Sequence, residues 1–423
     1  MNSIILKPGY VKGCVAVPSS KSVAHRALIA AAFSDKMIRV KKVDFSKDIY
    51  ATMDALRQLG VTIKEEKDFI LVDGSTIVKG SEVSINANES GSTLRFMIPV
   101  ATLLEKTVTF DGKGRLPERP LDDYFEIFDK LGVEYSCPEG KYLPLKVSGD
   151  IEFAKVNVKG NTSSQFITGL IFCGLVNSVK VNITTELQSK PYVDITVDVL
   201  KKFGCIINEN DNSYEIKKTP TLIDEYSVER DWSQAAFFMC AAAINGCITL
   251  KEMNMDSAQG DMEIISLLKK FGACIKINGS DLTVEKSDLH GIEIDVGDIP
   301  DLVPTLSVLA CFAKGKTKIY NAARLRIKES DRLQAMYEEL AKLGADVEIG
   351  EDYLIINGGK PLHGAEVDSH NDHRIAMAMA VASVGCEGDV ILNGHSAVSK
   401  SYPHFFEDWS NLNEQYFTKE YKL

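Results

Sequence analysis

The feature that most constrains the fold is an internal repeat. Six stretches share one design, in which a short alternating strand pattern leads through a few polar residues into an apolar helix of small residues. These stretches are residues 13–33, 81–104, 154–175, 224–244, 291–313 and 364–384. Their starts recur about every 70 residues, which indicates a repeated supersecondary unit. The polar residues of each stretch, here called its polar segment, lie at a strand end and a helix N-terminus.

A second repeated element is an amphipathic helix that ends at a glycine and is followed by a strand. The glycines are Gly60, Gly132, Gly204, Gly272 and Gly344. A sixth such helix is expected in PHFFEDWSNL, residues 403–412, but no strand follows it within its own repeat. We expect residues 3–8, SIILKP, to supply this strand, so that the N-terminus belongs with the C-terminal half.

Six βαβαββ-like units predict an α/β protein with two domains of three units each, one inserted into the other. We expect an inserted domain at residues 19–226 and a discontinuous domain formed by residues 1–18 and 227–423. The apolar helices should be buried in each domain, with the amphipathic helices and the sheets outside. Because the polar segments are equivalent, several helix N-termini should point at one face, which predicts an anion-binding cleft between the domains.

The composition of the chain restricts its possible partners and its cellular compartment. The net charge of −11 leaves no overall basic field, which excludes nucleic acid and membranes as partners and requires any anion site to be local. MNSIILKPGY lacks the regions of a signal peptide, so we expect a cytoplasmic protein. The nine cysteines form no CxxC pair, which indicates a reducing compartment and argues against structural zinc.

No cofactor or metal is expected from the motifs. GKT at 315–317 lacks the upstream glycine of a phosphate loop, since Ala310 stands there, and GKGRLP at 112–117 has no third glycine. His370 and His373 form an HxxH pair, which more often reflects two polar residues near a helix start than a metal site.

The polar segments concentrate groups that bind anions. Their candidate residues are Lys21, Ser22, Arg26, Ser92, Arg95, Ser163, Ser164, Gln165, Asp301, His373 and Arg374. A helix N-terminus contributes about 0.3–1 kcal/mol, whereas each charge-assisted hydrogen bond adds about 1.5–3 kcal/mol, so the cations should dominate binding. Outside these segments, RLPERP adds Arg115 and Arg119.

Two further interpretations remain open on spacing alone. Lys328 and Arg332 are four residues apart, a repulsive pair on a helix that either a shared anionic ligand or neutralisation by Glu329 and Asp331 would relieve. The candidate acids and bases are Asp301, Glu329, His373 and Lys21. Asp301 has the alternative role of a helix cap, and Glu329 that of an ion-pair partner for Arg332. These residues predict an enzyme acting on one or two small phosphorylated acids.

Nine motifs, in order and spacing, resemble those of the EPSP synthase family. They are PSSKSVAHRAL, ESGSTLR, LPERP, SSQF, SKPYVDIT, IPD, KESDR, NDHR and VSKSYPHFFED. The resemblance runs nearly end to end and implies two inverse α/β-barrel-like domains of three units, with the active site between them. It also implies transfer of the enolpyruvyl group of phosphoenolpyruvate to the 5-hydroxyl of shikimate 3-phosphate, by addition and elimination through a tetrahedral intermediate. Relatives suggest a monomer.

The same resemblance assigns site residues by motif. Those for shikimate 3-phosphate are Lys21, Ser22, Arg26, Ser163, Ser164, Gln165, Ser189, Tyr192, Asp301 and Lys328. Those for phosphoenolpyruvate are Lys21, Gly91, Arg119, Gln165, Arg332, Arg374 and Lys400. Asp301 is expected to act as base toward the hydroxyl and Glu329 to protonate and deprotonate the methylene carbon, with Lys21 and His373 assisting.

Some residues depart from the pattern of the EPSP synthase family. Glu89 stands where Asn is common, Ser92 where Thr is common, and Arg324 where some members carry Asn. Gly91 is kept, which suggests sensitivity to glyphosate.

The nearest alternative function is that of the enolpyruvyl transferase acting on UDP-N-acetylglucosamine. That family pairs its early Lys with Asn and carries a loop Cys that GKGRLPERP lacks. A non-catalytic anion-binding repeat protein would not need Asp301 and Glu329, and an RNA-end cyclase would need a basic surface.

Overall fold

The computed structural model describes residues 3–77, 79–149 and 154–412, and the chain divides into two compact units. The inserted unit is Ser19–Glu229, and the discontinuous unit combines Met1–Pro18 with Arg230–Leu423. The chain leaves the inserted unit after Glu229, slightly later than the expected boundary between residues 226 and 227. The reason is that β14 (Glu225–Ser227) pairs in parallel with β3 (Ile38–Lys41), so the inserted unit keeps this strand. No described helix is long and apolar enough to cross a bilayer.

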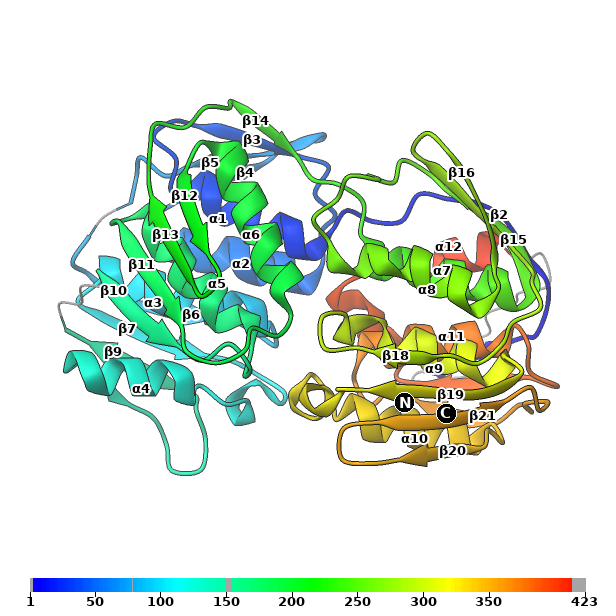
Figure 1. The fold of residues 1–423 in the computed structure, drawn as a ribbon. Coiled ribbons are helices and arrows are strands. Elements are labelled where there is room, and N and C mark those ends of the chain that lie inside the picture. Colours follow the sequence, from blue (N-terminus) through cyan, green and yellow to red (C-terminus); the bar gives the residue numbers. More distant parts are fainter. Residues whose placement is uncertain (1–2, 78, 150–153, 413–423) are drawn as a thin grey trace. The chain divides into compact units, whose positions relative to one another are not determined.

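The inserted unit contains the first half of the repeats (Figure 1). Its helices are α1 (Lys21–Ala32), α2 (Lys47–Gln58), α3 (Gly91–Leu104), α4 (Asp122–Leu131), α5 (Ser164–Phe172) and α6 (Lys190–Phe203), with short 3-10 helices η1 (Leu116–Glu118) and η2 (Cys173–Leu175). Its remaining strands are β4 (Thr62–Glu65), β5 (Phe69–Asp73), β6 (Glu82–Asn86), β7 (Thr107–Asp111), β8 (Glu134–Ser136), β9 (Leu145–Ser148), β10 (Lys155–Val158), β11 (Val179–Ile183), β12 (Ile206–Asn210) and β13 (Ser213–Lys217).

Each repeat of the inserted unit forms one four-stranded sheet. In the orders β6-β7-β9-β8 and β10-β11-β13-β12, the first two strands are parallel and the other pairs are antiparallel. The third sheet, β14-β3-β5-β4, has the same pattern, although its first strand comes from the far end of the unit. In the first two sheets the parallel strands are connected by the buried helices α3 and α5, which permits the parallel pairing.

The discontinuous unit repeats this plan. Its helices are α7 (Trp232–Asn245), α8 (Ile264–Phe271), α9 (Val303–Phe312), α10 (Arg332–Lys342), α11 (His373–Ser383) and α12 (Phe405–Asn411), with 3-10 helices η3 (Gly260–Glu263), η4 (Pro300–Leu302), η5 (Ala323–Ile327) and η6 (His395–Lys400). Its strands are β1 (Ser3–Leu6), β2 (Val11–Val15), β15 (Gly246–Leu250), β16 (Cys274–Asn278), β17 (Asp281–Glu285), β18 (Glu293–Asp295), β19 (Gly315–Tyr320), β20 (Val347–Ile349), β21 (Leu354–Gly358), β22 (Glu366–Asp368) and β23 (Val390–Asn393).

The N-terminal strands complete two sheets of this unit. β2 lies parallel to β15 in the order β16-β17-β15-β2, and β1 lies antiparallel to β23 in the three-stranded sheet β1-β23-β22. The third sheet has the order β18-β19-β21-β20. The prediction that the N-terminal strand supplies the missing strand of the last repeat is confirmed, as is the sixth amphipathic helix, α12.

The apolar helices form the centre of each unit. Every residue of α7 from Trp232 to Ile244 is buried, and α1 and α11 are buried over almost their whole length. By contrast, α2, α4 and α10 bury only one face. Helices that are apolar on all sides need protein on all sides, so the predicted layering is confirmed.

The positions of the repeated glycines, and of one residue in some of the polar segments, are explained by the way helices begin and end. The five helix-terminating glycines all have positive φ, from +69° at Gly132 to +106° at Gly204, a region that glycine adopts without steric cost. At the other ends, Ser20, Ser90 and Asp372 cap α1, α3 and α11 through their side chains. Capping thus accounts for one polar residue in each of these segments and leaves the others for a different role.

Candidate active site

The first polar segment of the inserted unit holds its lysine by an ion pair. Lys21 is the first residue of α1, and its Nζ lies 2.6 Å from Oδ2 of Asp48 in the first turn of α2. The backbone and hydroxyl of Ser19 bond Asp44, and Ser20 caps the helix. Asp48 therefore offsets the cost of a cation at a helix N-terminus and fixes its position.

Arg26 is a buried cation surrounded by neutral acceptors. Its side chain donates to Oγ1 of Thr196 at 2.7 Å, to the Tyr192 carbonyl at 2.8 Å and to the Ser22 carbonyl at 2.7 Å. Burial lowers the pKa of Arg26 to about 9. Among the described residues no carboxylate is bonded to it, so an anion beside this guanidinium would supply the missing negative charge.

The second and third polar segments contact each other. Nη1 of Arg95 donates to Oε1 of Gln165 at 2.9 Å, and Nε2 of Gln165 donates to Oγ of Ser92 at 3.0 Å. Arg119 is buried beside the N-terminus of α3, where a Cβ added to Gly91 would lie 2.4 Å from its Nη1. Gly91 therefore leaves room for the Arg119 guanidinium.

The remaining candidates of the inserted unit lie at the starts of α5 and α6. Ser163 caps α5, accepting from the Gln165 amide at 3.3 Å, and Ser164 is buried next to it. Ser189 precedes α6 with a φ of +55°, and the Tyr192 carbonyl already accepts from Arg26. The structure thus gathers these residues around helix N-termini.

In the discontinuous unit, Arg332 is the centre of an ion-pair network. Its guanidinium contacts Asp301 Oδ1 at 2.8 Å, Glu329 Oε2 at 2.7 Å and Asp372 Oδ2 at 2.7 Å, and its side chain is 1% exposed. Burial opposes the charge, but the three carboxylates together raise the pKa of Arg332. Glu329 is thus an ion-pair partner of Arg332, whereas Lys328 precedes α10 and lies near Asp301, so the two cations do not share a helix. Asp331 instead caps α10 and pairs with Arg326.

Asp301 binds cations rather than capping a helix. Its carboxylate accepts from Arg332 at 2.8 Å and Arg374 at 2.9 Å, and Lys328 Nζ lies 3.8 Å away. Burial would raise the pKa of Asp301, but Arg374, Lys328 and Arg332 outweigh it and hold that pKa well below its usual range. The carboxylate is therefore ionised and weakly basic. For the neighbouring Lys328, burial itself disfavours the charged form and lowers the pKa to about 8.

Three candidates lie at or near the start of α11. His373 is its first residue and is buried, with Nδ1 3.8 Å from Oδ1 of Asp372. Arg374 contacts Asp301, and Nζ of Lys400 donates to the Asn371 carbonyl at 2.6 Å. The structure thus brings together Asp301, Lys328, Glu329, Arg332 and Arg374 in one network.

The sequence pattern gives no signal for several supporting residues. Asp48 holds Lys21, and Thr196 holds Arg26 from a position far along the chain. Asp372 lies inside the NDHR motif and binds Arg332. Asp261 is buried and accepts from the Ser233 hydroxyl, which in turn accepts from Arg374 at 3.3 Å. Burial, followed by the charge of Asp301, raises the pKa of Asp261 to about 7.

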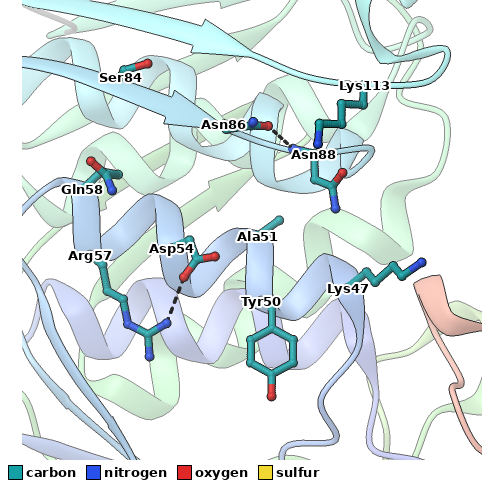
Figure 2. A pocket seen from close by; sticks show the side chains of 10 residues that line it. All are labelled: Lys47, Tyr50, Ala51, Asp54, Arg57, Gln58, Ser84, Asn86, Asn88 and Lys113. Atoms are coloured by element: carbon teal, nitrogen blue, oxygen red, sulfur yellow. Dashed lines mark hydrogen bonds and ion pairs between the residues drawn. The ribbon is translucent and has the colours of Figure 1, made fainter.

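A pocket of about 550 Å³ in the inserted unit is lined by none of these residues. It lies between the outer face of α2 and strand β6, and Figure 2 shows its polar lining. Arg57 is paired there with Asp54 at 2.9 Å, and the Asn88 amide bonds the Asn86 side chain at 2.8 Å. The lining contains none of the residues assigned by motif, so this pocket is not the candidate site.

Two groups of cations, all buried except the partly exposed Lys21, are suited to small multiply charged anions. In the inserted unit these cations are Lys21, Arg26, Arg95 and Arg119, and in the discontinuous unit Arg332, Arg374 and Lys400. Asp301 and Glu329 add carboxylates that can carry protons. The residue types therefore allow both binding of phosphorylated acids and acid–base chemistry.

Comparisons with known proteins agree with this chemistry. The family described as EPSP synthase (3-phosphoshikimate 1-carboxyvinyltransferase) matches residues 5–409. A 3-phosphoshikimate 1-carboxyvinyltransferase of Clostridium acetobutylicum is 48% identical over 419 residues, covering 97% of both chains. One from Clostridium perfringens strain SM101 is 45% identical, covering 98% of this chain and 99% of its own.

Solved structures show the same fold. An EPSP synthase structure from Acinetobacter baumannii has a TM-score of 0.81 and 26% identity, with full coverage of both chains. The enolpyruvyl transferase NikO from Streptomyces tendae has a TM-score of 0.78 at 16% identity, covering 100% of this chain and 99% of its own, which supports the two-domain enolpyruvyl transferase fold alone. Because the family match and these relatives span almost the whole sequence, the chain belongs to the EPSP synthase family.

Proposed function

We propose that the chain transfers the enolpyruvyl group of phosphoenolpyruvate to the 5-hydroxyl of shikimate 3-phosphate and releases phosphate, a step of the shikimate pathway. The observation that carries this function is the family match over residues 5–409. In the addition step, a bond forms between the 5-oxygen and C2 of phosphoenolpyruvate, and C3 gains a proton. In the elimination step, C3 loses a proton while the bond from C2 to the phosphate oxygen breaks. The related reaction on UDP-N-acetylglucosamine is not favoured.

We assign shikimate 3-phosphate mainly to residues of the inserted unit. Arg26 supports this assignment because it is a buried cation bonded to neutral acceptors. Its partners on this substrate are the other residues of the motif assignment: Lys21, Ser22, Ser163, Ser164, Gln165, Ser189, Tyr192, Asp301 and Lys328. The hydroxyls and the amide can bond ring hydroxyls, while the cations take the phosphate and the carboxylate.

We assign phosphoenolpyruvate to Lys21, Gly91, Arg119, Gln165, Arg332, Arg374 and Lys400. Arg332 and Arg374 are already held by Asp301, so their guanidinium groups need little reorganisation when an anion binds. Gly91 contributes space rather than a contact, because a side chain there would displace Arg119. This proposal thus assigns residues of both units to phosphoenolpyruvate.

The proton transfers require groups on two sides of the reacting carbon. In this proposal Asp301 accepts the hydroxyl proton, and Glu329 delivers a proton to the methylene carbon and later removes one. The pKa of Asp301 is low while Arg374 and Arg332 bond it. When phosphoenolpyruvate shares these cations, that pKa should rise and Asp301 becomes a better base. Lys21 and His373 assist by stabilising charge.

We further propose that the enzyme works as a monomer in the cytoplasm. The monomer is the state that the family resemblance suggests. Phosphorylated acids do not cross membranes unaided, which favours the compartment in which they are made.

The test is phosphate release from phosphoenolpyruvate by purified protein. One reaction contains shikimate 3-phosphate and a matched one contains UDP-N-acetylglucosamine. We expect release only with shikimate 3-phosphate, together with formation of the enolpyruvyl ether detected by mass spectrometry. Release only with UDP-N-acetylglucosamine, or with neither acceptor, would contradict the proposed function.

A further inference from the structure

Helix α10 holds the last polar segment at two separate points. At its N-terminus, Arg332 Nε donates to Asp372 Oδ2 at 2.7 Å. Two turns later, Glu339 accepts from the Asp368 amide at 3.0 Å, and its Oε1 lies 2.6 Å from Nε2 of His370. The loop from Asp368 to Asp372 therefore spans two anchors on one helix.

Glu339 is a buried and ionised anchor. Its side chain is 0% exposed, and both of its oxygens also accept from Lys342 Nζ at 2.9 Å. Burial opposes ionisation, but hydrogen bonds from His370, Lys342 and the Asp368 amide keep the pKa of Glu339 below its ordinary value. Because the carboxylate is ionised, the imidazole of His370 is the donor in their bond.

The anchored loop has an unfavourable backbone conformation. His370 and Asn371 are consecutive and have φ values of +50° and +52°. Asparagine tolerates this region, but histidine adopts it only where its surroundings determine it. This conformation presents the Asn371 carbonyl to Lys400 Nζ at 2.6 Å, immediately before Asp372 caps α11.

The internal repeat provides a comparison for His370. Each of three strands ends in an Asn or Asp that accepts from the amide two residues later: Asn86 from Asn88 at 2.8 Å, Asp295 from Gly297 at 2.9 Å and Asp368 from His370 at 2.6 Å. This turn requires only a backbone N–H at the later position. A histidine is therefore not required by the turn, and its ring has a separate partner in Glu339.

We propose that His370 and Glu339 form a positioning clamp that sets the affinity for phosphoenolpyruvate. The clamp fixes the loop from Asp368 to Asp372. In this loop the Asn371 carbonyl holds Lys400, and the Asp372 carboxylate holds Arg332. The clamp also fixes the start of α11, which carries Arg374. Neither His370 nor Glu339 needs to touch the substrate. This inference rests on the proposed assignment of those three cations to phosphoenolpyruvate.

A metal site is the competing interpretation of the same residues. Glu338, Glu339 and His370 offer ligand atoms within 4.8 Å of one another. However, Lys342 and the Asp368 amide already satisfy the Glu339 oxygens, and Gln334 donates to Glu338 at 2.8 Å. The oxygens of both carboxylates thus already have hydrogen-bond partners in the protein, which favours the clamp.

The test measures Michaelis constants for both substrates in His370→Asn. Asparagine tolerates positive φ but is too short to reach Glu339, so the variant removes the clamp while keeping a suitable backbone residue. We expect KM for phosphoenolpyruvate to rise about tenfold, with KM for shikimate 3-phosphate and kcat within about twofold of the wild type. His363→Asn, a change at an exposed histidine outside the clamp, should leave all three constants unchanged.

Glu339→Gln keeps the size of the second partner. The double variant His370→Asn/Glu339→Gln should raise KM for phosphoenolpyruvate no more than the stronger single variant, because both changes break one interaction. Additive effects would overturn the clamp, as would an equal rise in KM for both substrates. A rise in the wild-type KM on treatment with EDTA would also overturn it, in favour of a metal site.

Lys400→Met separates this inference from the proposed site. If Lys400→Met raises KM for phosphoenolpyruvate but His370→Asn does not, the clamp is wrong and the assignment of Lys400 stands. If Lys400→Met leaves that constant unchanged, the assignment of Lys400 to phosphoenolpyruvate is wrong, and the clamp as proposed is wrong with it.

Discussion

Glu329 combines a fixed position with access to ligands, which suits a group that moves protons. Its carboxylate lies 2.7 Å from Nη2 of Arg332 and remains 22% exposed. Glu329→Gln keeps the shape and an acceptor for Arg332 but cannot exchange a proton. We expect kcat to fall roughly a hundredfold or more, with substrate dissociation constants changed less than about threefold. Single-turnover kinetics and calorimetric binding measure the two effects, and near-normal turnover would exclude Glu329 from this role.

Gly91 shows how one missing side chain positions a cation. In Gly91→Ala the new Cβ would lie 2.4 Å from Arg119 Nη1, so the guanidinium must move. We expect KM for phosphoenolpyruvate to rise about tenfold, or about 1.4 kcal/mol, while the melting temperature stays unchanged because alanine suits a helix. KM for shikimate 3-phosphate serves as the internal control. An unchanged KM for phosphoenolpyruvate would show that Arg119 does not bind it.

At the scale of elements, the amphipathic helices depend on their terminal glycines. Gly132 ends α4 with a φ of +69°, and a Cβ added there meets nothing within 4 Å. Gly132→Ala therefore measures backbone strain alone, and we expect a cost of about 1 kcal/mol and a fall in melting temperature of about 2–4 °C. Gly132→Asn should lose less than half of this, because asparagine tolerates the left-handed region. Equal losses in differential scanning calorimetry would contradict the strain explanation.

At the scale of the whole molecule, the candidate residues for the same two substrates belong to both units. The chain passes between the units only near Pro18 and Glu229. We therefore expect the radius of gyration to fall when both substrates, or shikimate 3-phosphate with an unreactive phosphoenolpyruvate analogue, are bound. Small-angle X-ray scattering of the free and doubly bound protein measures this change. An identical radius at saturating ligand would contradict substrate-driven closure.

Much of the fold follows from local patterns in the sequence. The period of apolar residues predicts the buried and amphipathic helices, because α7 needs apolar neighbours on every side whereas α10 needs them on one. The glycine stops and the serine caps also act within a few residues, so they are readable without tertiary structure. The unpaired last helix even predicts the pairing of β1, which lies along β23.

The sequence alone did not identify the partners of the site residues. Arg26 with Thr196, Lys21 with Asp48 and Arg332 with Asp372 join positions that are far apart in the chain. No periodicity records such a pair, because each depends on how separate repeats pack. The same limit placed the second boundary too early, since only the pairing of β14 with β3 assigns that strand.

The sequence by itself determined the repeat, the types of the elements, the family and the cations that an anionic substrate needs, because these are properties of local pattern and residue type. Only the tertiary structure decided which carboxylate neutralises each cation, which strand completes each sheet and how Glu339 fixes the loop before α11. Those features arise from distances between residues of different repeats, and such distances exist only once the chain has folded.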